Sequence, residues 1–397
     1  MAGLLQACTG AKERLDPPPQ SLTEQAKALG IANARFYPDT QGAALVQEGI
    51  AAFKREIDFK GYDPQNPPPV NFLAVSGGGD DGAFGAGLLT GWTLTGTRPE
   101  FKLVTGVSTG SLIAPFAFLG PAYDAELKEV YTTISTADVY KERGILAAFD
   151  DDALSDTSPL FATMSKYMDE AMLSDIATEY DKGRLLIIGS TNLDAQRPVL
   201  WNIGAIAKSG HPDALTLVRK ILLASAAVPV AFPPVLINVE ADGRTYQELH
   251  VDGGAIAQLF LYPPSIGAAM REARNVDHVD RERTAYVLFN GRLNPQWARV
   301  ERSTLPIAGR AVSTMIHSSA LNDLIKVYVT TQRDGVDFNL ASIGTDFDTP
   351  RPDIDFDPTY MQTLFDYGFA LGKAGYPWQK VPPLLRTAQD VEAVVSQ

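Results

Sequence analysis

A serine between two glycines is the first candidate for chemistry in this sequence. The motif at 106–110 reads Gly-Val-Ser-Thr-Gly, with Ser108 at its centre. An apolar, β-branched run at 101–105 predicts a strand before it, and the apolar run from 111 predicts a buried helix after it. A serine on such a sharp strand-to-helix turn holds its hydroxyl clear of the sheet, and the small flanking residues make room for the turn. The position therefore suits a nucleophile.

A glycine-rich turn at 77–82 precedes this motif, between a predicted strand at 71–76 and a predicted helix at 83–93. Successive backbone N–H groups there converge on a helix N-terminus, which favours a negatively charged ligand. That ligand is either the pyrophosphate of a dinucleotide or the oxyanion of an acyl-transfer intermediate. A dinucleotide fold needs an acid at the end of its second strand, and the nearest one, Glu100, precedes that strand. The oxyanion is the favoured interpretation, and a purely structural tight turn is the third alternative.

An aspartate followed by two glycines, Asp252-Gly253-Gly254, closes a predicted strand at 244–251. Taken alone, this pattern is typical of a turn. An exposed aspartate, with a pKa of about 3.9, is also a weak base toward a hydroxyl at neutral pH. Catalysis would need Asp252 to lie close to the serine in a partly dry pocket, where a carboxylate is a stronger base.

The chain order of these three motifs resembles that of the patatin-like phospholipase family. Two further stretches, at 190–194 and 224–234, are similar to segments of that family, and the resemblance covers roughly 71–290. It implies a serine–aspartate dyad without histidine, in which Ser108 is the nucleophile and Asp252 is the base that takes its proton. It also implies hydrolysis of a lipid or small carboxylic ester through an acyl-enzyme, with no metal ion and no organic cofactor.

The resemblance also assigns the backbone groups that would hold the oxyanion. The expected oxyanion-hole residues are Gly77, Gly78, Gly79 and Thr109. The glycines expected to support the three motifs are Gly82, Gly106, Gly110, Gly253 and Gly254.

One departure from the family concerns charge. The family usually has an arginine or lysine before the last glycine of the first turn, where this chain has Asp81 after Asp80. Two carboxylates beside an oxyanion site repel the charge that the site must hold. The site can still work if both point outward or if one of them caps the following helix, and we expect the cap. Otherwise the chain is a weak enzyme or a non-catalytic envelope protein that binds lipid or another partner.

A histidine triad is the alternative mechanism for an esterase. Such a triad needs a histidine after the acid in the chain, which leaves His278 and His317 as candidates. His278 falls in a charged run and His317 in a long helical pattern, so both are typical of ordinary surface or helix histidines.

Composition limits the classes of partner. The 397 residues carry a net charge of −13, which argues against nucleic acid and against general electrostatic docking to anionic lipid. A lipid hydrolase can still make peripheral contact with a membrane through exposed apolar groups. Two long uncharged runs, at 103–123 and 221–239, contain prolines and predict buried core instead of transmembrane helices. The oligomeric state does not follow from the sequence.

The N-terminal residues Leu4-Leu5-Gln6-Ala7-Cys8 resemble the end of a bacterial lipoprotein signal. The basic start and the full apolar run of such a signal are not present before them. If the resemblance is genuine, Cys8 anchors the protein by a lipid on the periplasmic side of the cell envelope, with the residues up to 20 as a tether. A cytoplasmic location is the alternative.

Strands and helices alternate through 71–290, which predicts a three-layer α/β/α sandwich with a mostly parallel central sheet, as in the patatin-like fold. The active site should lie at the carboxyl ends of the strands. The pattern divides the chain into a signal remnant or tether (1–20), an N-terminal helical extension (21–70), a catalytic domain (71–290) and a C-terminal α+β addition, mainly helical and packed on it (291–397). Acids near the C-terminus lack the spacing of a calcium loop, so no metal site is expected.

Overall fold

The computed structural model describes residues 14–143, 152–276 and 279–385, and one sheet of nine strands forms its centre. The strand order is β1-β7-β6-β3-β2-β10-β11, and β9 pairs with both β6 and β8. Five neighbouring strands are parallel: β6 (Leu185–Asn192), β3 (Phe101–Gly106), β2 (Val70–Val75), β10 (Arg283–Arg292) and β11 (Asp337–Ile343). The other four make antiparallel pairs: β1 (Arg35–Phe36), β7 (Arg197–Asn202), β8 (Val235–Ala241) and β9 (Arg244–Asp252).

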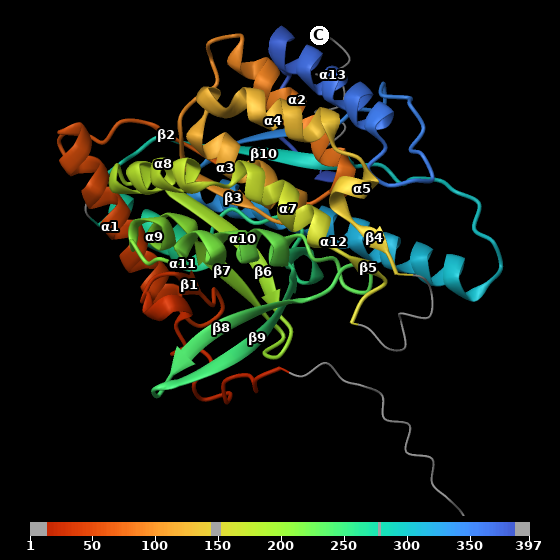
Figure 1. The fold of residues 1–397 in the computed structure, drawn as a ribbon. Coiled ribbons are helices and arrows are strands. Elements are labelled where there is room, and N and C mark those ends of the chain that lie inside the picture. Colours follow the sequence, from red (N-terminus) through yellow and green to blue (C-terminus); the bar gives the residue numbers. More distant parts are fainter. Residues whose placement is uncertain (1–13, 144–151, 277–278, 386–397) are drawn as a thin grey trace, which may run out of the picture.

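Helices cover both faces of this sheet (Figure 1), and the buried apolar side chains divide into two clusters. The larger cluster receives α2 (Gly82–Thr93), α3 (Thr109–Leu119), α4 (Asp124–Thr133), α7 (Ser158–Tyr167), α8 (Glu170–Asp181), α9 (Ile203–Lys208), α10 (Ala214–Ser225) and α13 (Pro358–Ala374). The smaller cluster receives α11 (Pro264–Asn275) and α12 (Thr304–Asp334). The expected three-layer sandwich with a mostly parallel sheet is therefore confirmed.

The register of the sheet brings the three sequence motifs to one edge. Val75, at the end of β2, lies opposite Gly106 at the end of β3, so the two glycine-rich turns leave the sheet side by side. Gly106 in turn lies opposite Ile188 of β6. Two residues further along β6, Ser190 pairs with Asp252 of the antiparallel β9. The last residue of β9 consequently arrives next to the turn that follows β3.

An unpredicted strand, β8, occupies the end of the uncharged run at 221–239, for which we expected only buried core. It forms a hairpin with β9 through Asp242 and Gly243, whose φ angles are 48° and 71°. Two such residues favour the tight hairpin turn whose twist matches that of the strands. The Asp-Gly pair was therefore the available signal for this strand. The helices α4 and α11 were also not predicted.

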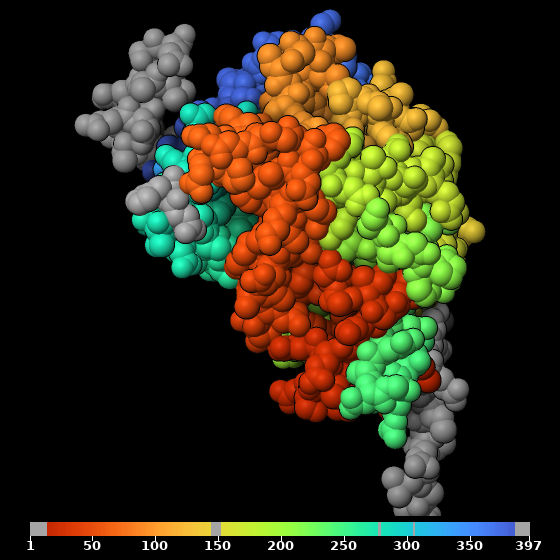
Figure 2. Space-filling model, turned by 90° about the vertical axis from the view of Figure 1, so that its left-hand side faces the viewer, coloured from red at the N-terminus to blue at the C-terminus, as the bar shows by residue number. Residues whose placement is uncertain are grey.

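The N-terminal extension lies along one side of the molecule (Figure 2, red and orange). Its main helix, α1 (Gly42–Lys60), packs against α11 and α8. Glu56 of this helix is buried and accepts hydrogen bonds from the Arg281 guanidinium at 2.6 and 3.0 Å. The Lys102 ammonium lies 2.8 Å from the same carboxylate. This buried ion cluster joins α1 to β3 and to the segment before β10.

The C-terminal segment completes the same sheet and its helical layer. β11 adds to β10 as a parallel edge strand. α13 packs closely on α2, because Gly87 and Gly91 of α2 face the backbone of α13, and Gly368 and Gly372 of α13 face that of α2. A Cβ atom at any of these four positions would collide with a backbone carbonyl of the other helix. Among the described helices, none is both long and apolar enough to cross a membrane.

Candidate active site

Ser108 occupies a strained turn between β3 and α3. Its φ and ψ angles are 55° and −129°, a conformation that non-glycine residues rarely adopt. A Cβ on Gly106 would collide with the backbone of Gly110, and a Cβ on Gly110 would collide with the carbonyl oxygen of Val75. At both positions another part of the backbone thus lies too close for any residue but glycine, as the sequence predicted.

Ser225 of α10 holds this turn from the side. Its hydroxyl accepts a hydrogen bond from the N–H of Ser108 at 3.1 Å and donates one to the carbonyl of Gly189 in β6 at 2.7 Å. The side chain is completely buried. Ser225 lies in the stretch at 224–234 that carried the family resemblance, but its role in positioning Ser108 was not predicted.

Asp252 ends β9 and is only 4% exposed. Its Oδ1 accepts a hydrogen bond from the N–H of Gly254 at 2.7 Å, and its own N–H donates to the carbonyl of Ala227 at 2.8 Å. Among the described residues, no donor reaches full hydrogen-bonding geometry with the buried Oδ2. Burial raises the pKa of Asp252 to about 7. The nearby Ser108 hydroxyl and the N–H of Gly254 both favour the ionised carboxylate and so work to lower this pKa. The structure thus brings Ser108 and Asp252 together.

The turn after β2 places two glycines next to Ser108, but one predicted donor is engaged elsewhere. The N–H of Gly77 donates to the carbonyl of Gln258 at 3.1 Å, so Gly77 cannot donate to an oxyanion, and that prediction is wrong. A Cβ on Gly78 would collide with Asn290, so this position also needs glycine. Gly79 opens a short 3-10 helix and Thr109 opens α3, and N–H groups in a first helical turn have no partner within the helix.

Gln258 and Asn290 support these turns and were not predicted as site residues. The Gln258 side chain donates to the carbonyl of Gly254 at 3.1 Å, so this residue joins the turn that begins at Gly77 to the one that follows Asp252. Asn290 donates from Nδ2 to the carbonyl of Ser76 at 3.0 Å and from its backbone to the Ser76 hydroxyl at 2.8 Å. A polar residue at the end of a buried strand was a usable signal for Asn290, whereas Gln258 lies in a loop without a motif.

The charge of the first turn is balanced by a residue that the sequence did not indicate. Neither Asp80 nor Asp81 caps the following helix, so that expectation is wrong. Instead, Arg351 forms an ion pair with the buried Asp80 and lies 3.4 Å from Asp81. The backbone N–H of Phe356 also donates to Asp80, at 3.2 Å, and the Tyr360 hydroxyl donates to Asp81 at 2.6 Å. Burial raises the pKa of Asp80 to about 6, and Arg351 works to lower it.

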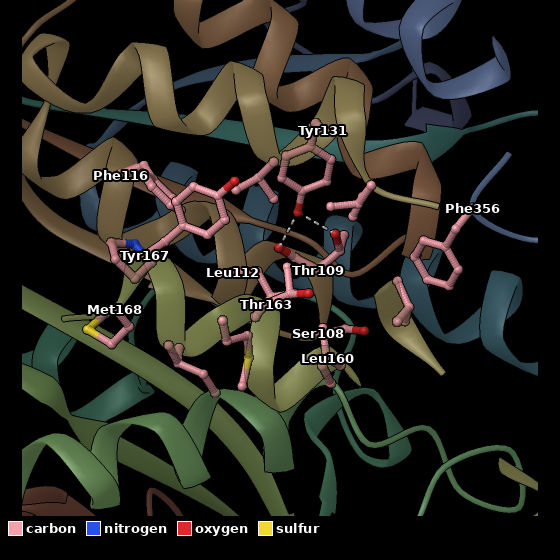
Figure 3. Close-up of a pocket in the computed structure, with 18 of the residues that line it drawn as sticks. Ser108, Thr109, Leu112, Phe116, Tyr131, Leu160, Thr163, Tyr167, Met168 and Phe356 are labelled. Atoms are coloured by element: carbon pink, nitrogen blue, oxygen red, sulfur yellow. Dashed lines mark hydrogen bonds between the residues drawn. The ribbon is translucent and has the colours of Figure 1, made fainter. Parts of the chain in front are cut away.

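A narrow apolar cavity begins at Ser108 and extends between the helices (Figure 3). Gly79, Ser108 and Thr109 line it together with apolar side chains of α3, α4, α7 and α10. In Figure 3, Ser108 and Phe356 lie toward one end of the cavity, and Phe116, Tyr167 and Met168 lie toward the other. The Tyr131 hydroxyl is within 2.7 Å of Thr109 Oγ1 and donates to the Thr109 carbonyl at 3.2 Å, which fixes the start of α3. The cavity has the shape and the polarity to hold an alkyl chain.

None of the described histidines lines the cavity. His250 is buried, with its ring nitrogens 3.0 Å from the Ser190 hydroxyl and 3.1 Å from Glu248. His317, on α12, is not among the residues that line the cavity. His278 lies outside the described residues, as does Cys8. Within the described part of the chain, no group of three histidine, cysteine, aspartate or glutamate side chains is placed to hold a metal ion.

Comparison with known proteins finds one family match, over part of the chain. Residues 73–263 match the family model of the patatin-like phospholipases. Among solved structures, the chain is similar to VipD from Legionella pneumophila, with a TM-score of 0.36 and 11% sequence identity over 78% of this chain and 67% of that chain. No curated protein matches the chain. The matched range of the family model contains both Ser108 and Asp252.

Proposed function

We propose that this protein cleaves a carboxylic ester of a lipid through an acyl-enzyme on Ser108, since residues 73–263 match the family model of the patatin-like phospholipases. The observation that carries the proposal is that Ser108, on its strained turn, lies near the buried Asp252 at one end of an apolar cavity. The three features together meet the needs of acyl transfer: a nucleophile, a base and a place for the acyl chain.

Ser108 attacks in the first half of the proposed reaction. Asp252 accepts the hydroxyl proton while Ser108 Oγ bonds to the ester carbonyl carbon. The carbonyl oxygen becomes an oxyanion, which accepts hydrogen bonds from the N–H groups of Gly78, Gly79 and Thr109. The bond to the alcohol then breaks, and Asp252 returns its proton to the leaving oxygen. In the second half, Asp252 deprotonates a water molecule, which attacks the carbonyl carbon of the acyl-enzyme. The bond to Ser108 Oγ then breaks, Asp252 returns the proton to Ser108 Oγ, and the carboxylic acid leaves.

The surroundings of Asp252 support its role as the base. A solvated aspartate loses its proton near pH 4 and holds it too weakly to accept the serine proton at neutral pH. Burial raises the pKa of Asp252 to about 7, close to the working pH, which is where a general base is most effective. The pairing of Asp80 and Asp81 with Arg351 also lessens the repulsion that these carboxylates would exert on an oxyanion.

Ester hydrolysis by matched variants tests this proposal. We expect the wild type to hydrolyse p-nitrophenyl butyrate and a phospholipid, and Ser108→Ala and Asp252→Asn to lose about 10³-fold or more of kcat/KM while remaining folded by circular dichroism. Ser318→Ala, an exposed serine of α12, and His317→Ala are the controls and should keep wild-type rates. Loss of activity in His317→Ala would favour a histidine triad. Failure of a fluorophosphonate to label wild-type Ser108 would reject the hydrolase and favour a binding protein.

For location, we propose a lipid anchor on Cys8 in the bacterial envelope, on the support of the signal-like residues alone. Radiolabelled palmitate should enter the wild-type protein and not Cys8→Ala. Equal labelling of the two, or none of the wild type, would favour the cytoplasm.

A further inference from the structure

A second cavity, of about 420 Å³, adjoins the apolar one on the Ser108 side. The two cavities share Gly79, Val228, Phe232 and Phe356 as lining residues. Figure 3 shows that Phe356 lies on the side of Ser108, away from the end formed by Phe116 and Met168. Ser108 therefore lies close to the region where the two cavities meet. An ester bound with its acyl chain in the apolar cavity directs its alcohol part into the second one.

The polar lining of this second cavity is mainly acidic. Three carboxylates, Asp80, Glu142 and Asp355, face one guanidinium, that of Arg351. Arg351 already interacts with Asp80, with Asp81 at 3.4 Å and with Asp355 at 3.6 Å, so its positive charge is more than compensated. An anion entering the cavity meets net repulsion, whereas a cation is attracted.

The two cations on either side of Glu142 in the chain, Lys141 and Arg143, do not line the cavity. Arg143 lies 3.8 Å from Asp152 and 3.9 Å from Asp156. The excess of negative charge is thus a property of the cavity wall itself.

Aromatic rings form the rest of the recognition surface. The ring centroid of Tyr140 lies 5.5 Å from that of Phe232 and 6.5 Å from that of Phe356, and all three side chains line the cavity. Aromatic faces attract organic cations but cannot replace the water shell of a small metal ion. A wall of aromatic rings with nearby carboxylates is the usual environment for a substituted ammonium group.

We propose that the second cavity binds an ammonium group on the alcohol part of the substrate. This inference rests on the proposed function and narrows it: the substrate is an ester whose alcohol carries a choline-like or ethanolamine-like group, as in zwitterionic phospholipids. Lipids whose head group has only negative charge are poor substrates. The acyl cavity selects the chain, and the acidic aromatic cavity selects the head group.

Binding of two small amphiphiles of opposite charge tests the inference without requiring catalysis. Hexyltrimethylammonium and hexanesulfonate have the same alkyl chain, and their affinities for the Ser108→Ala protein are measured by titration calorimetry at low salt. We expect the cation to bind at least about tenfold more tightly, as for a desolvated cation–π site with carboxylates. The double variant Glu142→Gln, Asp355→Asn should reduce the ratio to about threefold or less, since it removes two charges. Tyr140→Leu should weaken only the cation.

Asp353→Asn is the matched control, because Asp353 is an exposed acid of the same segment that does not line the cavity. It should keep the full preference. Equal or tighter binding of hexanesulfonate, no binding of either probe, or an unchanged ratio in the double variant would overturn the inference.

Activity separates this inference from the proposed function. With the wild type, 1-palmitoyl lysophosphatidylcholine should be cleaved at least about tenfold faster than 1-palmitoyl lysophosphatidylglycerol in neutral detergent micelles. If Ser108 reacts with a fluorophosphonate but neither assay shows a preference, the hydrolase stands and the ammonium site is wrong. If Ser108 is unreactive while the cation still binds selectively, the hydrolase is wrong and the ammonium site stands.

Discussion

Two buried aspartates lie in the turns around Ser108, and they differ in whether a cation lies next to them. Asp252, after β9, is held by the N–H of Gly254, and no cation among the described residues shifts its pKa. Asp80, after β2, is held by the N–H of Phe356 and paired with Arg351. Burial raises the pKa of both, to about 7 and about 6. The difference shows how one residue type serves two purposes: without a counter-ion a buried carboxylate can take up a proton, and with one it becomes a fixed structural contact.

Replacing each aspartate by asparagine gives the largest expected contrast. Asp252→Asn should lower kcat/KM by about 10³-fold or more, because the base is lost, with the free energy of unfolding unchanged or increased at pH 8. Asp80→Asn should retain activity within about tenfold but destabilise the fold by about 1–2 kcal/mol, because Arg351 loses its buried partner. Esterase kinetics and urea unfolding measure the two effects. Similar activity losses in both variants would contradict the division of roles.

Removing the guanidinium of Arg351 tests the ion pair with Asp80 and Asp81 alone. Arg351→Met leaves Asp80 and Asp81 buried without their counter-ion, and we expect a loss of about 2 kcal/mol, below the usual range for a buried pair because the arginine side chain is 48% exposed. The triple variant Arg351→Met, Asp80→Asn, Asp81→Asn should recover most of this loss. Urea unfolding at pH 8 provides the measurement. Full stability of the single variant would mean that Arg351 is not needed to neutralise the turn.

The pH dependence of activity and stability tests the role of Asp252, the aspartate without a cation next to it. Activity should rise through an apparent pKa of about 7, as Asp252 becomes ionised and able to accept a proton. Stability should change in the opposite sense: between about pH 4 and pH 7 the folded protein keeps a proton that the unfolded chain releases, so the free energy of unfolding falls as pH rises. Asp80 adds a smaller slope of the same sign, up to about pH 6. Kinetics and urea unfolding from pH 4 to 9 test both trends, and a wild-type slope retained in Asp252→Asn would exclude this residue as its source.

The smallest expected effect concerns the hydroxyl that donates to Asp81. Tyr360→Phe removes this hydrogen bond and should destabilise the fold by about 1 kcal/mol. Tyr123→Phe is the matched control, since the Tyr123 hydroxyl also donates to an aspartate, Asp175, but at an exposed site, and it should change stability by less than about 0.5 kcal/mol. Equal losses of stability in the two variants would show that the hydrogen bond to Asp81 stabilises the fold no more than an exposed one does.

The sequence predicted the elements whose signals are local. Alternating strands and helices indicated the sandwich, and the glycines at 106 and 110 were correctly associated with the tight turn around Ser108. β8 was missed because its apolar residues follow an uncharged run without a break, although Asp242 and Gly243 mark the hairpin after it.

Long-range contacts were beyond the sequence. Arg351 pairs with residues about 270 positions earlier in the chain, and no spacing rule links them. Gly77 fits the glycine pattern, but its N–H donates to the carbonyl of Gln258. A hydrogen bond between two backbone groups leaves no signal in the types of side chain. Both depend on how the loops fold back on the sheet.

The position of Arg351 in the chain has a consequence for the order in which the protein is made. Synthesis proceeds from the N-terminus, and domains fold as their residues leave the ribosome. The glycine-rich turn at 77–82, Ser108 and Asp252 all emerge well before Arg351 and the glycine-lined face of α13 that packs on α2. Until then, Asp80 and Asp81 lack Arg351, and the glycine-lined face of α2 lacks α13. A nascent chain thus contains Ser108 and Asp252 before it contains the residues that complete their surroundings.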